Sequence, residues 1–385
     1  MVQLNHPAQG NTNWFTPVDQ NWTTLEQSLD QAICEGRLSL SGSVALPMTD
    51  VTAATTLYYI PYKGDRISLY TGSTWQINSI PSAGSGATSL SLSGLTASTN
   101  YDIFLYNNSG TLTLDKLIWT SVTASNNPAA GSNVTINVSN TSGVVVGSLV
   151  TLLNSARNST TGLFNIETAR VNAVSANTSI TVDTLINSYT TPTVTYRMAS
   201  QDGILVKPGD STRRYLGTIR ITSTAGQCED SQVRRFVSNY YNRVPRSLFV
   251  CPDYSSSVSN TYTTASTTYV QCNGGTNATV EFVSTGEDAT QYLMQLNGQN
   301  SMASQWRIGV GEDSTSGPTS GAQTLGSGHS APACGRTAIF TAGYHYLTML
   351  INNGGSGTVT VNANQPADGG PLNPYGSCLS ALVMG

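Results

Sequence analysis

The side chains that could carry out catalysis are few in this chain of 385 residues. It has three histidines, and an activated nucleophile needs a base such as histidine within hydrogen-bond reach. His6 lies in a polar N-terminal arm, His329 precedes Ser330 in a Gly/Ser-rich loop, and His345 lies between two tyrosines in an expected strand. Neither a GxSxG nucleophile elbow nor an HExxH zinc motif occurs. We therefore interpret His329 as an exposed loop residue and His345 as a packed or half-exposed strand residue, and we predict no catalytic residue.

Two pairs of neighbouring carboxylates, Glu287-Asp288 and Glu312-Asp313, stand out in the last third of the chain. Paired carboxylates can act as general acid and base in glycoside hydrolysis, and clustered oxygens can bind calcium. Each pair directly follows a glycine, which is typical of a turn, and neither resembles an EF-hand loop. We expect solvated turn residues and predict no bound metal. Walker A and GxGxxG motifs are also absent, so we predict no cofactor.

Six cysteines are present, and no two have the CxxC spacing of zinc ribbons or thioredoxin-like redox motifs. The first residues lack the basic and apolar regions of a secretory signal, so we expect reduced thiols. Cys251 and Cys272 bracket a Ser/Thr-rich loop, and a disulfide between them stays open as an alternative.

The composition favours a protein made of strands. Only 10% of the residues are charged, against about 25% in an average globular protein, whereas 38% are hydrophobic. This is enough apolar material for packed cores, unlike a disordered chain. A net charge of −4 argues against a nucleic-acid-binding protein, and no apolar run is long enough to span a membrane. Because Ser, Thr, Val, Asn and Gly favour strands and turns, we predict a mainly β protein. It would have modular β-sandwich or barrel domains, an N-terminal helix and one central helix.

The hydrophobic pattern divides the chain into five segments. Residues 1–37 form an arm followed by an amphipathic helix over 21–33, with Trp22, Leu25 and Leu29 on one face. Residues 38–121 together with 200–228 form a central β-module, in which alternating residues flank a turn at 107–110 and predict a hairpin. Residues 122–199 contain few aromatic side chains and form a small inserted β-domain. A linking helix over 229–246 and a C-terminal domain over 247–385 complete the chain.

The segment 229–246 is predicted to be helical because its apolar residues recur at helical spacing, with Asp230 or Ser231 as a cap and Pro245 at the end. It belongs to a basic region, 203–246, which holds eight of the 17 Lys and Arg: Lys207, Arg213, Arg214, Arg220, Arg234, Arg235, Arg243 and Arg246. We predict that this helix forms a subunit interface through Val233, Phe236, Val237, Tyr240 and Tyr241, with Arg234 and Arg235 meeting carboxylates of neighbouring copies. Packing on the chain's own β-domain, a solvated face and contact with an anionic partner are the alternatives.

Residues 247–385 contain seven or eight expected strands separated by Gly-rich loops, which indicates a head with a jelly-roll-like sandwich. Tyr254, Tyr262 and Tyr269 interrupt Ser/Thr-rich sequence in this head. Exposed tyrosines can stack on sugars or make adaptable protein contacts, so we predict a contact surface there. Packing of these rings at strand or subunit edges is the alternative.

Several runs of the chain resemble tail-fibre-like structural proteins of tailed-bacteriophage virions. The matching runs are Tyr62–Tyr70 with Trp75, Tyr101–Tyr106 with Leu112–Leu114 and Trp119, Asp202–Lys207, Arg213–Arg220 and Arg235–Val244. Trp14–Ile33 is similar to the attachment helices of phage fibres, and Leu382–Gly385 is similar to the family's ending. The resemblance covers about half of the chain and leaves out 122–199, which favours the insertion.

The resemblance implies a homotrimeric, non-enzymatic virion component. It would attach to other virion proteins by its N-terminus, through Trp14, Trp22, Leu25 and Leu29. Its head would contact a host surface glycan or protein through Tyr254, Tyr262 and Tyr269. We expect synthesis in the host cytoplasm and a final location in the virion, with neither nucleic-acid binding nor membrane insertion. A head fibre or capsid-decorating protein is one alternative, and a capsule depolymerase is another.

Overall fold

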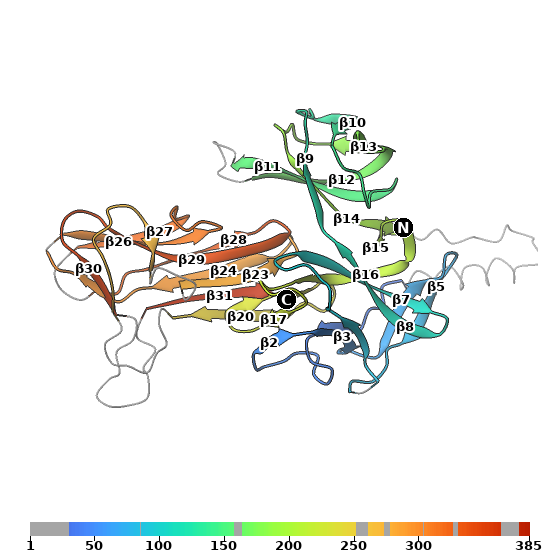
Figure 1. The fold of residues 1–385 in the computed structure, drawn as a ribbon, viewed down its shortest axis with the longest axis horizontal. Helices are drawn as coiled ribbons and strands as arrows, with labels where there is room; N and C mark the ends of the chain where they lie inside the picture. Colours follow the sequence, from blue (N-terminus) through green and yellow to red (C-terminus); the bar gives the residue numbers. More distant parts are fainter. Residues whose placement is uncertain are drawn as a thin grey trace, which may run out of the picture. The chain divides into compact units, whose positions relative to one another are not determined.

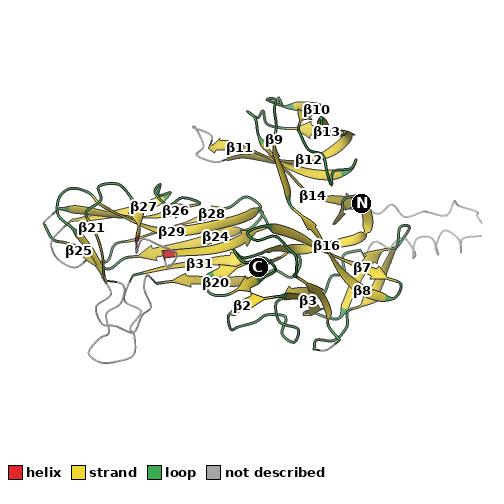
Figure 2. Ribbon diagram, in the orientation of Figure 1, coloured by secondary structure: helices red, strands yellow, loops and turns green. Residues whose placement is uncertain are grey.

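The computed structural model describes residues 31–84, 86–157, 164–251, 261–272, 278–302, 304–325, 330–362 and 377–385. These residues form a mainly β protein, as the composition predicted (Figures 1 and 2). The chain divides into two compact units. Unit 1 comprises Met1–Pro47, Thr55–Gln227 and Asn239–Asn242, and unit 2 comprises Met48–Ala54, Cys228–Ser238 and Arg243–Gly385. No helix in the described ranges is long and apolar enough to cross a membrane.

Unit 1 is built from two small sheets and one long sheet. The small ones are β1 (Gly36–Ser39), β3 (Thr56–Pro61) and β6 (Thr88–Ser91), and the hairpin β4 (Arg66–Tyr70) and β5 (Trp75–Ser79). The long sheet has the order β10-β13-β12-β11-β14-β15-β16-β7-β8, with β9 also paired to β14. Its strands are β7 (Asn100–Asn108), β8 (Thr111–Ile118), β9 (Thr120–Thr123), β10 (Gly131–Asn137), β11 (Ser148–Arg157), β12 (Phe164–Ser175), β13 (Ser179–Leu185), β14 (Thr193–Gln201), β15 (Ile204–Lys207) and β16 (Asp210–Arg220).

The hairpin that the sequence predicted is confirmed as β7 and β8. Asn108 pairs with Thr111, so Ser109 and Gly110 form a two-residue loop. Both loop residues have positive φ, 51° and 95°, as a type I′ turn requires. Both sides of β7 are buried here, so Tyr101, Ile103 and Leu105 lie on one side of the strand and Asp102 and Phe104 lie buried on the other.

Residues 122–199 surround a hydrophobic core made of their own side chains. The buried cluster includes Ile136, Val150, Val171, Val182 and Val194 from five different strands. β-Branched residues suit such a packed sheet. Within unit 1, β14 leaves this core and continues through β15 into β16 beside β7.

Unit 2 is a sandwich of two sheets around one core. One sheet has the order β2-β17-β18-β23-β29-β26-β27 with β22 also paired to β29, and the other has the order β20-β31-β24-β28. Both contribute to one buried cluster, for example Phe282 and Trp306 from the first and Met294 and Leu379 from the second. The predicted C-terminal sandwich is therefore present, and its jelly-roll connectivity stays a prediction.

The strands of unit 2 outnumber the seven or eight expected in residues 247–385. They are β2 (Val51–Ala54), β17 (Cys228–Asp230), β18 (Arg234–Arg235), β20 (Pro245–Val250), β21 (Thr261–Thr264), β22 (Val270–Gln271), β23 (Thr279–Ser284), β24 (Ala289–Gln295), β25 (Gly298–Asn300), β26 (Gln305–Glu312), β27 (Ser320–Leu325), β28 (Ala333–Ile339), β29 (Gly343–Asn353), β30 (Val359–Asn362) and β31 (Cys378–Met384). β19 (Val237–Asn239) spans the sequence boundary between the units. β21, β30 and β25 form a further small sheet.

The predicted central helix over 229–246 is wrong. This segment forms β17, β18, β19 and the start of β20 instead. β17 pairs with β2, and β18 pairs in parallel with β23, so partners distant in sequence satisfy its backbone groups. Its apolar residues are Val, Phe and Tyr, which have low helix and high strand propensity. The predicted N-terminal helix lies outside the described residues.

Candidate functional site

The arginines of the basic region are bound to acceptors within their own units. In unit 2, Arg234 donates to Glu281 and Glu229 at 3.0 and 3.2 Å, and the Tyr344 hydroxyl donates to the other oxygen of Glu281. Asp230 accepts from Arg235 and Arg246, both at 2.9 Å. These carboxylates belong to the same chain, whereas we had expected those of neighbouring copies.

The Asp230 carboxylate is shared by two buried guanidinium groups. Burial, together with the positive charge of Arg235, lowers the pKa of Arg246, while the Asp230 carboxylate opposes this effect. Arg235 also donates to the backbone carbonyl of Ser247 at 2.9 Å. Buried charges persist only where they are paired and hydrogen-bonded, so Asp230 fixes this corner of unit 2.

The apolar residues predicted for a trimer interface pack inside the chain. In unit 2, Phe236 is 2% exposed with its ring 6.2 Å from that of Tyr344, Val237 is buried and Val233 packs against the sandwich core. In unit 1, Tyr240 lies 5.4 Å from Tyr215, and Arg214 lies over the Tyr241 ring. Their role at a subunit interface stays a prediction, and surfaces for assembly have to be sought among exposed residues.

Unit 1 contains a buried polar cluster that the sequence analysis missed. Arg197 on β14 donates to Asp102 on β7 at 3.1 Å, and also to Tyr215 and Thr218 on β16. Its guanidinium lies 4.0 Å from the centre of the Trp119 ring. Burial by itself would lower the pKa of Arg197, but the Asp102 carboxylate holds it above its ordinary value. This cluster ties three strands together.

Arg214 is buried without a carboxylate partner among the described residues. Its Nη1 donates to the carbonyls of Gln31, Ile33 and Ser68 at 2.9–3.1 Å, so it holds the chain at residues 31–33 against β4. Within the described part of the chain, its Nε and Nη2 have no hydrogen-bond acceptor. The aromatic ring of Tyr241, 4.7 Å away, contributes a cation–π contact.

His345 lies in an arrangement that resembles a catalytic triad in composition but not in geometry. Its Nδ1 lies 2.7 Å from Asp313, and its Nε2 lies 2.8 Å from the Thr341 carbonyl and 3.2 Å from the Thr341 hydroxyl. A carbonyl oxygen only accepts, so Nε2 must donate to it. A triad base needs Nε2 as an acceptor from the nucleophile. The arrangement therefore clamps His345, which is packed rather than half-exposed.

Glu287 and Asp288 lie in the turn between β23 and β24, where Glu287 is exposed as expected, whereas Glu312 is buried at the end of β26. Glu287 and Asp288 both accept from Arg243. Glu312 accepts from Arg336 and from the Tyr292 hydroxyl. Within the described ranges, no group of three or more His, Cys, Asp or Glu could hold a metal ion.

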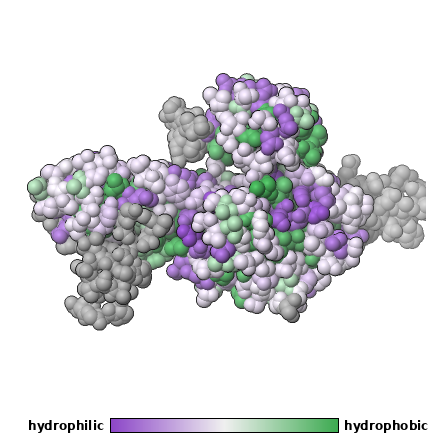
Figure 3. Space-filling view, viewed as in Figure 1, coloured by the Kyte–Doolittle hydropathy of each residue, from purple (hydrophilic) through white to green (hydrophobic). Residues whose placement is uncertain are grey.

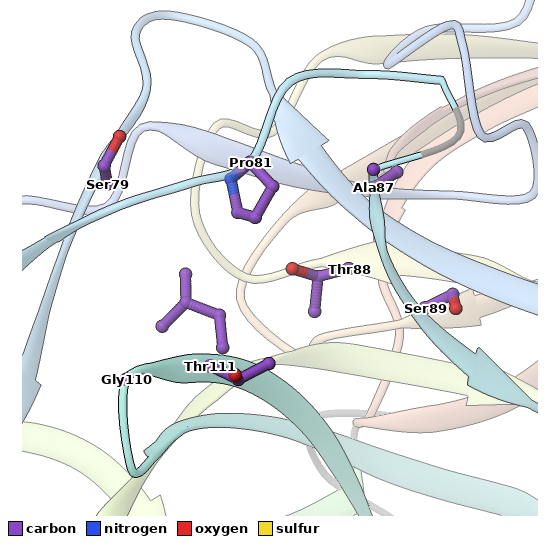
Figure 4. Close-up of a pocket in the computed structure, with 9 residues that line it drawn as sticks. Ser79, Pro81, Ala87, Thr88, Ser89, Gly110 and Thr111 are labelled. Carbon is purple, nitrogen blue, oxygen red and sulfur yellow. The ribbon is translucent and has the colours of Figure 1, made fainter.

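A shallow pocket of about 370 Å³ lies in unit 1 between β5, β6 and the β7–β8 turn. In Figure 4 the Pro81 ring and the side chains of Thr88 and Thr111 surround the open space. The lining is made of Ser, Thr, Gly, Ala, Pro and Leu. It provides neither an aromatic ring for sugar stacking nor a charge, so it is a poor candidate for a receptor site.

The outer face of the sheet β20-β31-β24-β28 carries no charged residue. Figure 1 shows these four strands side by side. Burial alternates along β24 and β31, and the residues of the outer face are Pro245, Ser247, Phe249, Cys378, Ser380, Leu382, Met384, Ala289, Gln291, Leu293, Gln295, Ala333, Gly335, Thr337 and Ile339. Ile339, Leu293 and Leu382 are 70%, 54% and 42% exposed. We call this set the uncharged face.

In an antiparallel sheet with one face in water, the residues on that face are usually polar and those on the opposite face apolar. The uncharged face differs from this pattern. Here the outward positions combine large apolar side chains with small or amide ones. Much of the visible surface in Figure 3 is white or pale rather than strongly hydrophilic. Exposed large apolar side chains that share one side of a sheet, here Leu293, Leu382 and Ile339, indicate a candidate interaction surface.

The residues predicted for receptor contact and virion attachment are only partly described. Tyr262 packs against the sandwich core, and burial raises its pKa. Tyr269 is half-buried, and burial raises its pKa as well. Tyr254, Trp14, Trp22, Leu25 and Leu29 lie outside the described residues. The packing alternative fits Tyr262, and receptor contact stays a prediction.

No family model and no curated protein matches this chain. Among solved structures, it is similar to the insecticidal delta-endotoxin Cry8Ea1 of Bacillus thuringiensis (8% identity, 94% of this chain and 55% of the toxin, TM-score 0.23). It is also similar to the infectious bursal disease virus Gt strain (9%, 92% and 74%, TM-score 0.24) and to that virus's VP2 subviral particle (11%, 74% and 72%, TM-score 0.20). The chain thus spans about half of the length of the toxin. At these TM-scores the neighbours carry no argument about fold or function.

Proposed function

We propose that this chain is a structural, non-enzymatic virion protein that assembles with copies of itself, as a trimeric tail fibre or receptor-binding component. The uncharged face is the observation that carries the proposal. A surface without charge has nothing to complement a charged partner, whereas a second copy offers a face of the same chemistry. In a cyclic trimer, three such faces can turn toward one axis.

The size of the uncharged face fits the centre of an interface. Four strands about 4.8 Å apart and about seven residues long cover roughly 400 Å². A standard interface buries about 800 Å² on each partner. The sheet would therefore supply the apolar core of the contact, and residues around it would supply the polar rim.

The position of the runs that resemble phage tail-fibre-like proteins supports the virion part of the proposal. Although 122–199 separates them in sequence, β7 and β8 lie beside β16 in one sheet of unit 1. Arg214 on β16 also reaches the Ser68 carbonyl on β4. The matching runs within 62–119 and 202–220 thus belong to unit 1, as expected if they share an origin.

The mass of the intact full-length protein tests self-assembly. Light scattering should give three times 40.6 kDa. A variant with both Leu293→Lys and Leu382→Lys should lose the trimer and keep its β circular dichroism. Ile186→Lys, at an 81% exposed position in unit 1, is the matched control and should leave the trimer intact. A wild-type monomer would refute self-assembly.

The virion location has a separate test. Antibodies against the full chain should label purified particles of the virus that encodes it. Labelling along fibres supports the tail-fibre proposal, and labelling on the capsid shell supports the head-fibre or decorating alternative. Unlabelled particles would overturn both. Release of reducing sugar from host capsule by the purified protein would favour a depolymerase over a non-enzymatic role.

A further inference from the structure

Two of the six cysteines lie at the same end of a pair of neighbouring strands in unit 2: Cys251 directly follows β20, and Cys378 is the first residue of β31. β20 and β31 are antiparallel, and the pairs run from Pro245 with Met384 to Val250 with Leu379. The next position of this register brings Cys251 opposite Cys378. Both cysteines lie at the same end of the strand pair.

The backbone spacing at this position suits a disulfide. Residues directly opposite each other on antiparallel strands have Cα atoms about 4.5–5.5 Å apart, and disulfides span about 4.4–6.8 Å. Facing residues project to the same side of the sheet, here the uncharged face. The pKa of Cys251 supports their proximity, since burial and the neighbouring Cys378 raise it to about 12.

The other cysteines have no such partner. Cys272, which the sequence suggested as the mate of Cys251, is fully buried in the sandwich core, and neither is in a disulfide. Cys334 is buried in the same core, on β28. Cys34 contacts the Tyr59 hydroxyl in unit 1, and the Cys228 thiol faces the Phe236 carbonyl in unit 2. None of the six cysteines forms a disulfide in this structure.

We propose that Cys251 and Cys378 form a cross-strand disulfide when the protein meets a disulfide oxidant such as oxidised glutathione. The Cys251 thiolate attacks a glutathione sulfur, which forms a mixed disulfide and releases one glutathione. The Cys378 thiolate then attacks the Cys251 sulfur and releases the second. Two protein thiols are oxidised, one glutathione disulfide is reduced, and the two protons end on the two glutathione thiols. The step requires neither the trimer nor a virion.

Closing this bond would join the two ends of most of unit 2. The strands from β21 to β30 lie between the two cysteines in sequence. A cross-link over so long a loop removes many conformations of the unfolded chain, so it stabilises the folded unit. We expect the melting temperature of unit 2 to rise by roughly 5–10 °C after oxidation. Newly made protein in a reducing cytoplasm would stay in the dithiol form.

Peptide mapping of the full-length protein tests the proposal. Protein purified under reducing conditions is incubated with oxidised glutathione, denatured in iodoacetamide and digested without reductant. A cross-linked peptide should contain Cys251 and Cys378, with a loss of about 2 Da for the two hydrogens. The melting temperature of the same sample should rise.

Matched variants separate this bond from other oxidation. Cys251→Ser and Cys378→Ser should each abolish the cross-link and the gain in melting temperature, whereas Cys34→Ser should keep both. Cys251→Ala serves as a second variant if the serine protein does not fold. Six alkylated cysteines in cooperatively melting wild-type protein would overturn the proposal. A link to any other cysteine, or between two chains, would overturn it as well.

Discussion

Replacing Asp102 with alanine should destabilise unit 1 by about 3–5 kcal/mol, the usual effect of removing one partner from a buried ion pair. Asp102 is fully buried on β7, and Arg197 on β14 is 7% exposed. Without the carboxylate, the Arg197 guanidinium would keep its place in the sheet with no counter-charge, because the Tyr215 and Thr218 hydroxyls and the Trp119 ring only partly compensate.

The structure gives an independent estimate of this magnitude. The nearest nitrogen and oxygen are 3.1 Å apart. Two unit charges about 4 Å apart attract by about 4 kcal/mol at an effective dielectric constant of about 20. The hydrogen bond from the Thr218 hydroxyl to Asp102, 2.6 Å long, adds about 1 kcal/mol. Since the two units need not unfold together, a single global unfolding energy is a poor measure.

Hydrogen exchange followed by mass spectrometry measures the local opening energy in peptides from β7, β14 and β16. Asp102→Asn keeps the shape and one acceptor, so it should cost less than alanine, and Thr218→Val should cost about 1 kcal/mol. Peptides of unit 2 provide the internal control. If Asp102→Ala changes opening in these strands by less than 1 kcal/mol, the ion pair does not hold them together.

Three further predictions follow from the other charged and thiol groups. Asp230→Ala should destabilise unit 2 by about 3 kcal/mol in chemical denaturation, because it leaves Arg235 and Arg246 buried without a carboxylate. Glu287→Ala should cost at most about 1 kcal/mol, because the Glu287 side chain is 52% exposed. Burial alone would raise the pKa of Asp115, but Lys207 and Arg213 lower it. The stabilisation that the Asp115 carboxylate contributes is therefore complete above pH about 4, the ordinary pKa of an aspartate in an unfolded chain, and is lost as the pH falls further. In an acid titration, the Asp115→Asn variant should lose less free energy of unfolding than the wild type. Cys272 is completely buried, unlike the partly exposed Cys251, and burial also raises its pKa, so native protein at pH 8 should leave Cys272 unlabelled by iodoacetamide, and rapid labelling would contradict its burial.

Local sequence predicted those elements whose partners are close in the chain. Alternation through Tyr101, Ile103 and Leu105, followed by a Ser109-Gly110 turn, fixes a hairpin because both strands and the loop lie within 20 residues. The apolar run at Leu379–Met384 likewise corresponds to β31. Such elements depend on side-chain period and turn chemistry, which a single sequence contains.

The central segment shows where local pattern is insufficient. Val233, Phe236 and Tyr240 recur every three to four residues, so their spacing predicts a helix, yet the segment pairs as short strands. Its backbone partners are β2, which precedes it by about 175 residues, and β23, which follows it by about 45. Spacing within the segment contains no information about those partners.

Some features of the candidate sites could likewise be predicted from the sequence, and others only from the tertiary structure. The sequence by itself determined the β class, the scarcity of charge and the concentration of cations in 203–246, since these follow from composition alone. Only the tertiary structure decided that Arg197 meets Asp102 across 95 positions and that Cys251 and Cys378 come to the same end of the β20–β31 pair. It also decided that uncharged residues of four strands share one face. The reason is physical: strand pairing and ion pairing are set by which residues meet in space, and the free energy of each contact depends on burial by the whole fold.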